Sequence, residues 1–179
     1  MMRNKGTFIV WTLVLLGVLG APSAHSGGRS NPEKAQSLLA KQVLNKATAF
    51  LQAKQSADGA WRSETYGLLK SGQSLTPFVL FALTDSLAGN RQPNEESIQK
   101  AIGFLRAKSD PNGVHGRADS DFLDYPNYST AYALRCFLRF GNEDDRARIG
   151  KMTSYLEAQQ FSEKAGFEPD SPAYGGWGF

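Results

Sequence analysis

Cysteine and histidine are scarce in this sequence, and their scarcity excludes several kinds of site. The chain has 179 residues and a single cysteine, Cys136, so it cannot form a disulfide within itself. Of its two histidines, only His115 lies beyond the first residues of the chain. A metal centre built from several Cys and His ligands therefore has little support. The stability of the fold must come from packing.

Net charge is also small once the first residues are set aside. The formal charge of the whole chain is +3, but Arg3 and Lys5 contribute two of its 20 basic residues. From residue 27 onward, 18 basic residues face 17 acidic ones. No basic stripe of the kind that neutralises phosphates is visible, so we expect no binding to nucleic acid.

Only one long apolar run occurs, and it lies at the N-terminus. The basic Arg3 and Lys5 precede the apolar residues 8–21, and small residues follow. This order is typical of a secretory signal peptide, which we place at residues 1–26. We therefore expect residues 27–179 to be exported, to a periplasm or to the outside of the cell.

The alternative interpretation of the apolar run is an uncleaved membrane anchor. Residues 8–21 are shorter than the roughly 20 residues that a spanning helix needs, which favours cleavage. The protein would stay membrane-anchored if the signal were not removed. After cleavage, we expect no membrane span.

Three segments repeat one pattern, Lys-x-x-x-aromatic-Leu-x-Ala. The copies begin at Lys46, Lys100 and Lys151, so they are 54 and then 51 residues apart. Each copy has the period of an amphipathic helix. Asn94 and Asn142 precede acidic residues ahead of the second and third copies, an arrangement that favours a helix start.

A more apolar segment follows each of the first two copies, and a long polar loop separates each copy from its apolar segment. The sequence predicts an all-α fold with amphipathic helices outside and apolar helices inside. The expected helices span residues 32–55, 75–88, 94–108, 128–140 and 143–160. In a stacked array the long loops should gather on one face.

The end of the first copy resembles the QW motif of squalene and hopene cyclases, in which a glutamine after the helix is followed by Gly-x-Trp. The matching residues are Gln55, Gly59 and Trp61 in the first copy and Gln160, Gly176 and Trp177 in the last. The middle copy has Ser109 in place of the glutamine and His115 in place of the tryptophan. The chain thus resembles the α/α-toroid superfamily of terpenoid cyclases and protein prenyltransferases.

This resemblance implies a partial α/α toroid, an open arc of about five helices with repeats near residues 34–89, 94–141 and 143–179. It also implies a structural role for the matching residues. A glutamine at a helix end can bond backbone groups left unpaired there, and Gly59 can turn the loop with positive φ. We expect these residues to tie repeats together rather than to touch a substrate.

The residues that would perform cyclisation are not visible. Cyclases of this type carry an Asp-x-Asp-Asp acid at the start of an inner helix, but no carboxylate occurs in the four residues before Thr76 or Thr130. Prenyltransferase β subunits bind zinc through Asp, Cys and His. Here Cys136 has the spacing of a core residue and His115 lies in a loop, so we expect no zinc site.

A cluster of acidic residues, Asp119, Asp121 and Asp124, lies in the second long loop. Three carboxylates could hold a hard cation such as Ca²⁺ or raise one another's pKa. We favour a solvated polar loop, and we expect neither a metal nor a cofactor in this chain.

The length of the chain limits the function. Relatives close about six helix pairs into a ring, so five helices form less than half of it. The chain is then a fragment of a longer protein, which we favour, a degenerate paralogue, or a protein that completes its ring by oligomerising. Its inner helices need further repeats or self-association to be covered.

We expect an exported squalene-cyclase or prenyltransferase-type repeat protein that lacks the cyclisation acid and meets an apolar, isoprenoid-like ligand or a protein partner. One alternative is a non-catalytic helical-repeat module that binds a protein, glycan or lipid. Another is a fragment of a complete terpene-cyclase-like enzyme, an intramolecular transferase. The sequence leaves open whether the chain is catalytic.

Overall fold

A computed structural model describes residues 32–85, 94–117 and 125–178. Their five α-helices are α1 (Pro32–Ala53), α2 (Leu75–Asp85), α3 (Glu95–Lys108), α4 (Pro126–Phe140) and α5 (Arg146–Ala158). Three single-turn 3₁₀ helices accompany them, η1 (Gly67–Leu69), η2 (Glu143–Asp145) and η3 (Glu163–Ala165). Extended backbone pairs only at two isolated bridges within these ranges. The predicted all-α fold is therefore confirmed for the described residues. The predicted signal peptide lies outside them.

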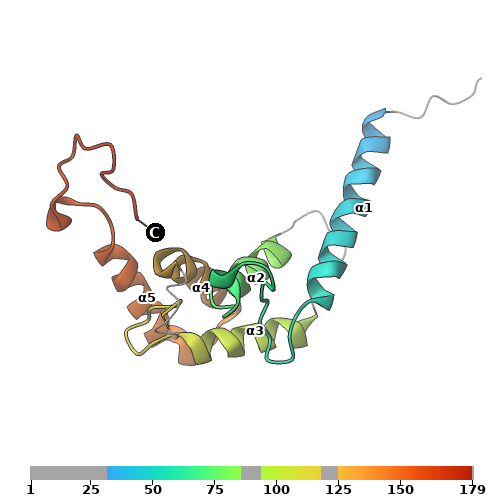
Figure 1. Cartoon of the computed structure of the whole chain (residues 1–179), viewed down its shortest axis with the longest axis horizontal. Helices are drawn as coiled ribbons and strands as arrows, with labels where there is room; N and C mark the ends of the chain where they lie inside the picture. The colour runs from blue at the N-terminus through green and yellow to red at the C-terminus, as the bar shows by residue number, and fades with distance from the viewer. Residues whose placement is uncertain (1–31, 86–93, 118–124, 179) are drawn as a thin grey trace, which may run out of the picture.

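Three outer helices enclose two inner ones in an open arc (Figure 1). α1 and α5 form the two ends of the arc, and α3 runs along its outer side. α2 and α4 lie on the inner side, where they pack against each other. Both inner helices also pack on α3, and α4 packs on α5. Outer and inner helices thus alternate along the chain.

The helix boundaries differ from the expected ones by a few residues. α4 begins at Pro126 instead of residue 128, because a proline fits the first turn of a helix. The expected start of the last helix at residue 143 is a 3₁₀ turn, and α5 itself ends at Ala158 instead of residue 160. The expected end of the second helix, at residue 88, lies outside the described residues.

Asn94 caps the start of α3 as predicted, whereas Asn142 caps the 3₁₀ turn η2 that precedes α5. The Asn94 side chain accepts a hydrogen bond from the backbone N–H of Ser97 at 2.8 Å. Asn142 accepts one from the backbone of Asp144, and its own N–H donates to the carboxylate of Asp145. These bonds satisfy donors that have no partner inside a helix.

Asp145 also joins two outer helices. Its buried carboxylate lies 2.7 Å from Arg106 of α3 and 2.6 Å from Arg148 of α5. The hydrogen bond from Arg106 holds the pKa of Asp145 below its usual value. A buried carboxylate with two guanidinium partners ties α5 to α3, and removal of either partner would leave charge poorly compensated.

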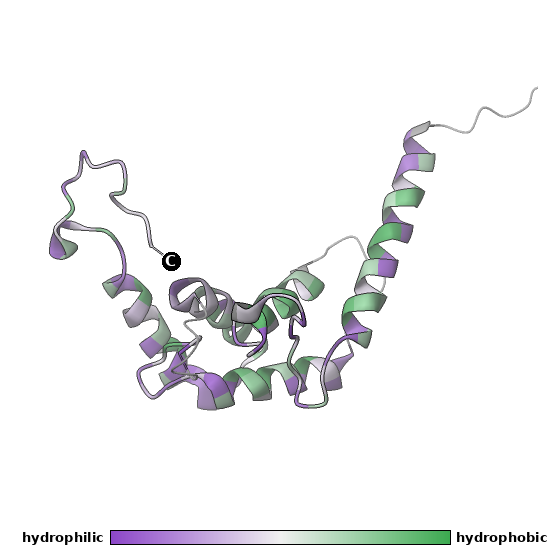
Figure 2. Ribbon diagram, in the orientation of Figure 1, coloured by the Kyte–Doolittle hydropathy of each residue, from purple (hydrophilic) through white to green (hydrophobic). Residues whose placement is uncertain are grey.

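The hydrophobic core lies where α2, α3 and α4 meet. Its largest fully buried apolar side chains are Trp61, Leu80, Ile102, Leu105, Phe137 and Met152. Figure 2 shows α2 as the most uniformly apolar helix, whereas α1 alternates between apolar and polar residues along its length. α1 buries little beyond Thr48 and part of Leu51, so the first repeat contributes to the core mainly through its loop and α2.

Candidate functional site

The first loop closes through the side chains of Gln55 and Trp61. The Gln55 amide donates to the carbonyls of Gly59 at 3.0 Å and Ser97 at 2.9 Å. The Trp61 indole N–H donates to the carbonyl of Leu51 at 2.6 Å. That carbonyl is in the last turn of α1, where it also accepts from the backbone N–H of Lys54 at 3.1 Å. Gln55 therefore closes its own loop and also reaches α3, the outer helix of the next repeat.

The last loop makes the same bonds with its own residues. The Gln160 amide donates to the carbonyl of Gly175 at 2.9 Å, and the Trp177 indole donates to the carbonyl of Leu156 at 2.7 Å. Gly175 precedes Trp177 by two residues, as Gly59 precedes Trp61. The positive φ of 78° falls on Gly175, and not on the Gly176 singled out from the sequence.

The middle loop keeps the geometry with different donors. The Leu105 carbonyl, which corresponds to those of Leu51 and Leu156, accepts from the Ser109 hydroxyl at 2.8 Å. His115 is fully buried, and its Nε2 lies 2.9 Å from the carbonyl of Gln73. Since a carbonyl only accepts, Nε2 carries the proton. Burial lowers the pKa of His115 to about 4, so the imidazole is neutral at pH 7.

A threonine at the start of each inner helix holds its loop. The Thr76 hydroxyl accepts from the backbone N–H of Trp61 at 3.0 Å and donates to its carbonyl. Thr130 makes the same pair of bonds to His115, at 2.9 and 3.2 Å. Sequence reasoning missed this role, although both pairs are separated by 15 residues.

Each of the first two loops packs on the next outer helix through a glycine that lies against the helix backbone. A Cβ on Gly59, which has φ +89°, would collide with the carbonyl of Lys100 in α3. A Cβ on Gly113, with φ +86°, would lie 2.6 Å from the Cβ of Lys151 in α5. Lys100 and Lys151 begin the second and third copies of the repeated pattern. Glycine is therefore needed twice for the same close approach.

Arginines from these loops cover aromatic side chains at the same register. Arg62 lies over the ring of Phe104, 5.4 Å from its centroid, and Arg117 lies over Tyr155 at 5.6 Å. Phe104 and Tyr155 are the aromatic residues of the second and third copies. Such cation–π contacts add about 0.5–1 kcal/mol each at partly exposed positions.

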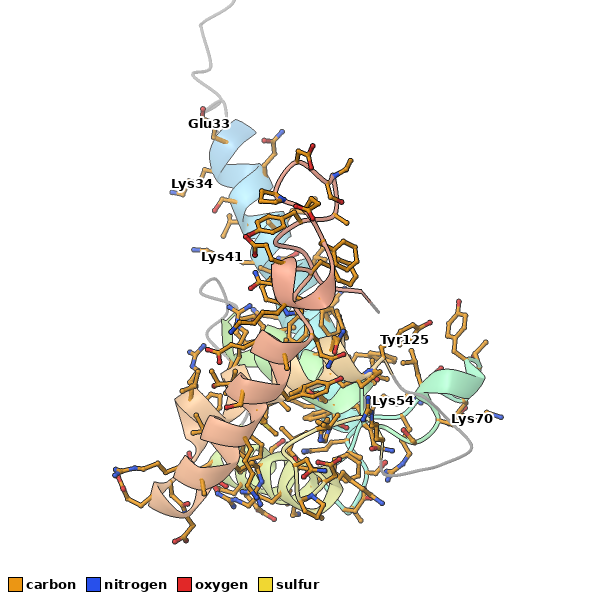
Figure 3. All side chains as sticks on the ribbon, turned by 90° about the vertical axis from the view of Figure 1, so that its left-hand side faces the viewer. Glu33, Lys34, Lys41, Lys54, Lys70 and Tyr125 are labelled. Atoms are coloured by element: carbon orange, nitrogen blue, oxygen red, sulfur yellow. The ribbon has the colours of Figure 1, made fainter. Side chains whose placement is uncertain are left out.

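An apolar hollow lies at the N-terminal ends of the inner helices. It has a volume of about 600 Å³ and is lined by Leu69, Ser74, Leu75, Phe78, Tyr125 and Tyr128. Small-molecule sites commonly have about 300–1,000 Å³ and an apolar lining. Figure 3 shows Tyr125 on the same side of the molecule as Lys70, which follows the lining residue Leu69. None of these aromatic residues was singled out from the sequence as a candidate site residue.

Aromatic rings continue from the hollow along the inner helices. Tyr132 lies 4.7 Å from Tyr128 and 5.2 Å from Phe78, measured between ring centroids. Phe81 extends the cluster and is covered by Arg135 at 3.7 Å. Below the rings, the hydroxyls of Ser74 and Ser129 bond each other at 2.6 Å. The inner helices thus meet through an aromatic surface.

The thiol and the acidic groups offer no catalytic constellation in the described part of the chain. Cys136 is buried in the core, where desolvation raises its pKa to about 12, and its Sγ contacts the carbonyl of Pro77. The prediction of Cys136 as a core residue is confirmed. The acidic residues Asp119, Asp121 and Asp124 lie outside the described residues. Within residues 32–85, 94–117 and 125–178, no group of three potential metal ligands comes together.

No helix among those described is both long and apolar enough to span a membrane.

No known family model matches the chain, and no solved structure matches it.

Proposed function

We propose that this chain is a module of an exported α/α-toroid repeat protein of the squalene-cyclase and prenyltransferase type, and that its inner face binds an apolar, isoprenoid-like ligand. The alternation of outer and inner helices supports the toroid arrangement. So do the hydrogen bonds that recur at Leu51, Leu105 and Leu156. Export rests on the basic, apolar and small-residue order of residues 1–26.

The hollow at the ends of α2 and α4 is the observation that carries the ligand proposal. Its lining is almost wholly apolar and aromatic, and Phe78, Tyr125 and Tyr128 stay partly exposed there. A branched hydrocarbon chain would remove these rings from water, with a gain of about 25 cal/mol per Å² of apolar surface. None of the described lining residues is a carboxylate, so these residues would bind such a chain without protonating it.

Calorimetric titration with farnesol tests the binding. We expect saturable binding to the wild-type protein and an affinity at least ten-fold lower for Tyr128→Ala, which removes a ring from the hollow. Leu138→Ala is the matched control, because Leu138 is an exposed apolar residue ten positions further along α4 and does not line the hollow. Absence of farnesol binding by the wild type, or equal losses in both variants, would contradict the proposal.

Product analysis after incubation with squalene separates binding from catalysis. We expect no polycyclic product, because no acid occurs among the described lining residues or in the four residues before Thr76 and Thr130. A cyclised product would show that another part of the chain supplies the proton, and the binding role would then be the first step of an isomerase reaction.

A further inference from the structure

α1 presents an uncovered face at the register where the other two outer helices are covered. Its residues Val43 and Phe50 are 58% and 60% exposed, and Ala47 between them is also exposed. These residues share one stripe of the helix, at positions i, i+4 and i+7. Apolar side chains in such a stripe usually pack against another element.

The same positions in α3 and α5 are covered by the preceding loop. Ala101 and Met152, which correspond to Ala47, are both fully buried. Phe104, which corresponds to Phe50, is only 5% exposed beneath Arg62 of the first loop. In both helices the element that covers this stripe is therefore the loop of the preceding repeat, closed by the hydrogen bonds described above.

The last loop exposes the surface that, in the first two loops, packs on the next outer helix. Gly59 and Gly113 are seated on a helix, but a Cβ on Gly175 would meet nothing within 4 Å. Trp177 is 51% exposed, whereas Trp61 is 2% exposed. The last loop has the fold of a covering loop. Among the described residues it bonds α4 at its end, where Asn127 donates to the carbonyl of Gly178 at 2.9 Å, but its Gly175 packs on no helix.

We propose that the last loop of one copy of this chain docks on α1 of a second copy. Gly175 would be seated at Lys46 and Ala47, as Gly59 is seated at Lys100 and Ala101. Gln160 would face the carbonyl of Val43, as Gln55 reaches that of Ser97. The occupant is a second copy because the chain holds both halves of a contact that it already makes twice internally.

The contact joins two different surfaces, the last loop and α1, and each copy of the chain has both. Such head-to-tail association builds a ring if the rotation closes and an open chain if it does not. Each added copy would continue the arc of Figure 1 beyond one of its two ends. It leaves the hollow between α2 and α4 accessible, because neither α1 nor the last loop lines that hollow.

Molar mass measured by light scattering during gel filtration of the full-length chain tests the proposal. We expect the wild type to exceed the mass of one copy with a concentration dependence. Ala47→Glu should weaken association at least ten-fold, since a charged side chain would occupy the seat of the glycine. The matched control is Ala53→Glu on the same helix, because Ala53, Ala107 and Ala158 are exposed in all three copies. Both changes leave a good helix former at an exposed position.

Cross-linking then identifies the two surfaces. Lys46→Cys and Tyr174→Cys, mixed and treated with a short bismaleimide, should give a covalent dimer that neither variant gives alone. Gly103→Cys is the control partner for Tyr174→Cys, because Gly103 lies on an exposed part of α3 with open space around it. The native Cys136 is buried and should not react.

A wild type with the mass of one copy at all concentrations would overturn the proposal. Equal association of Ala47→Glu and Ala53→Glu would also overturn it, as would a cross-link with Gly103→Cys as strong as that with Lys46→Cys. Circular dichroism checks that each variant is folded. Farnesol binding is measured separately, so loss of association and loss of the hollow are distinguishable.

Discussion

The first and last loops share the hydrogen bonds of their glutamine and tryptophan side chains, but their burial is very different. Trp61 and Trp177 each donate to a leucine carbonyl in the preceding helix, at 2.6 and 2.7 Å. Yet Trp61 is 2% exposed and Trp177 is 51% exposed. The loop is therefore formed by contacts within about 20 residues of chain. Its burial depends on an inner helix and the next outer helix, which the first loop has and the described part of the last loop lacks.

The largest effect should come from removing the buried member of this pair. Trp61→Ala deletes a side chain packed in the core together with Leu80 and Ala101. We expect a loss of about 4 kcal/mol in the free energy of unfolding, because of the cavity and the lost burial. Urea denaturation followed by circular dichroism measures it. An unchanged midpoint would show that the loop does not hold the repeats together.

His115 in the middle loop should make stability depend on pH between about 4 and 6.5. His115 has a folded-state pKa of about 4 and an unfolded value near 6.5, so between these pH values the unfolded chain binds the additional proton. Stability should therefore fall as pH decreases from 6.5 to 4, by up to roughly 3 kcal/mol, and should not depend on this residue above pH 6.5. Thermal unfolding of His115→Gln across this range is the measurement. The variant should lose that slope, and an equal slope in both proteins would contradict the buried neutral state.

Substitution of Gly59 and Gly175 compares a loop that packs on an outer helix with a loop whose glycine packs on none. Both have positive φ, so alanine is strained at either position, by about 1 kcal/mol. Gly59→Ala should cost about 2 kcal/mol, because its Cβ also collides with the backbone at Lys100. Gly175→Ala should cost only the strain. Denaturation of the two variants in parallel gives the difference in their free energies of unfolding. Equal losses would mean that the backbone of α3 near Lys100 can move to accommodate the added Cβ.

The smallest effect is expected for the exposed tryptophan. Trp177→Ala should change the free energy of unfolding by less than about 1 kcal/mol in dilute solution, since half of the side chain is already in water. The same denaturation experiment, carried out beside Trp61→Ala, measures it. A loss as large as that of Trp61→Ala would show that the two loops contribute equally and that exposure is a poor guide here.

Much of this architecture follows from the sequence because its signals are local. The apolar period, Asn94 and Asn142 predicted the helices to within a few residues. Gln55 was expected to bond backbone groups at the end of its own helix. Its amide instead bonds the carbonyls of Gly59 and Ser97, and the Trp61 indole reaches the carbonyl in the last turn of α1. These features depend on residues close together in the chain, where spacing is informative.

The hollow could not be predicted in the same way. Leu69 and Tyr125 are far apart in sequence and meet only because α2 and α4 pack side by side. Sequence period indicates which face of a helix is apolar, but not which two helices leave a gap between them. The middle loop was read as degenerate because Ser109 and His115 differ from the motif, and only their contacts show that they close the loop.

That middle loop has a consequence for how such repeats diverge. The carbonyls of Leu51, Leu105 and Leu156 each accept a side-chain bond, from an indole in two copies and from a hydroxyl in the other. The constant partner is the acceptor, whose position is set by the backbone and needs no particular side chain. A repeat can therefore exchange its donor during evolution without a change of shape. Repeats of this kind are better counted by these shared acceptor carbonyls than by their tryptophans.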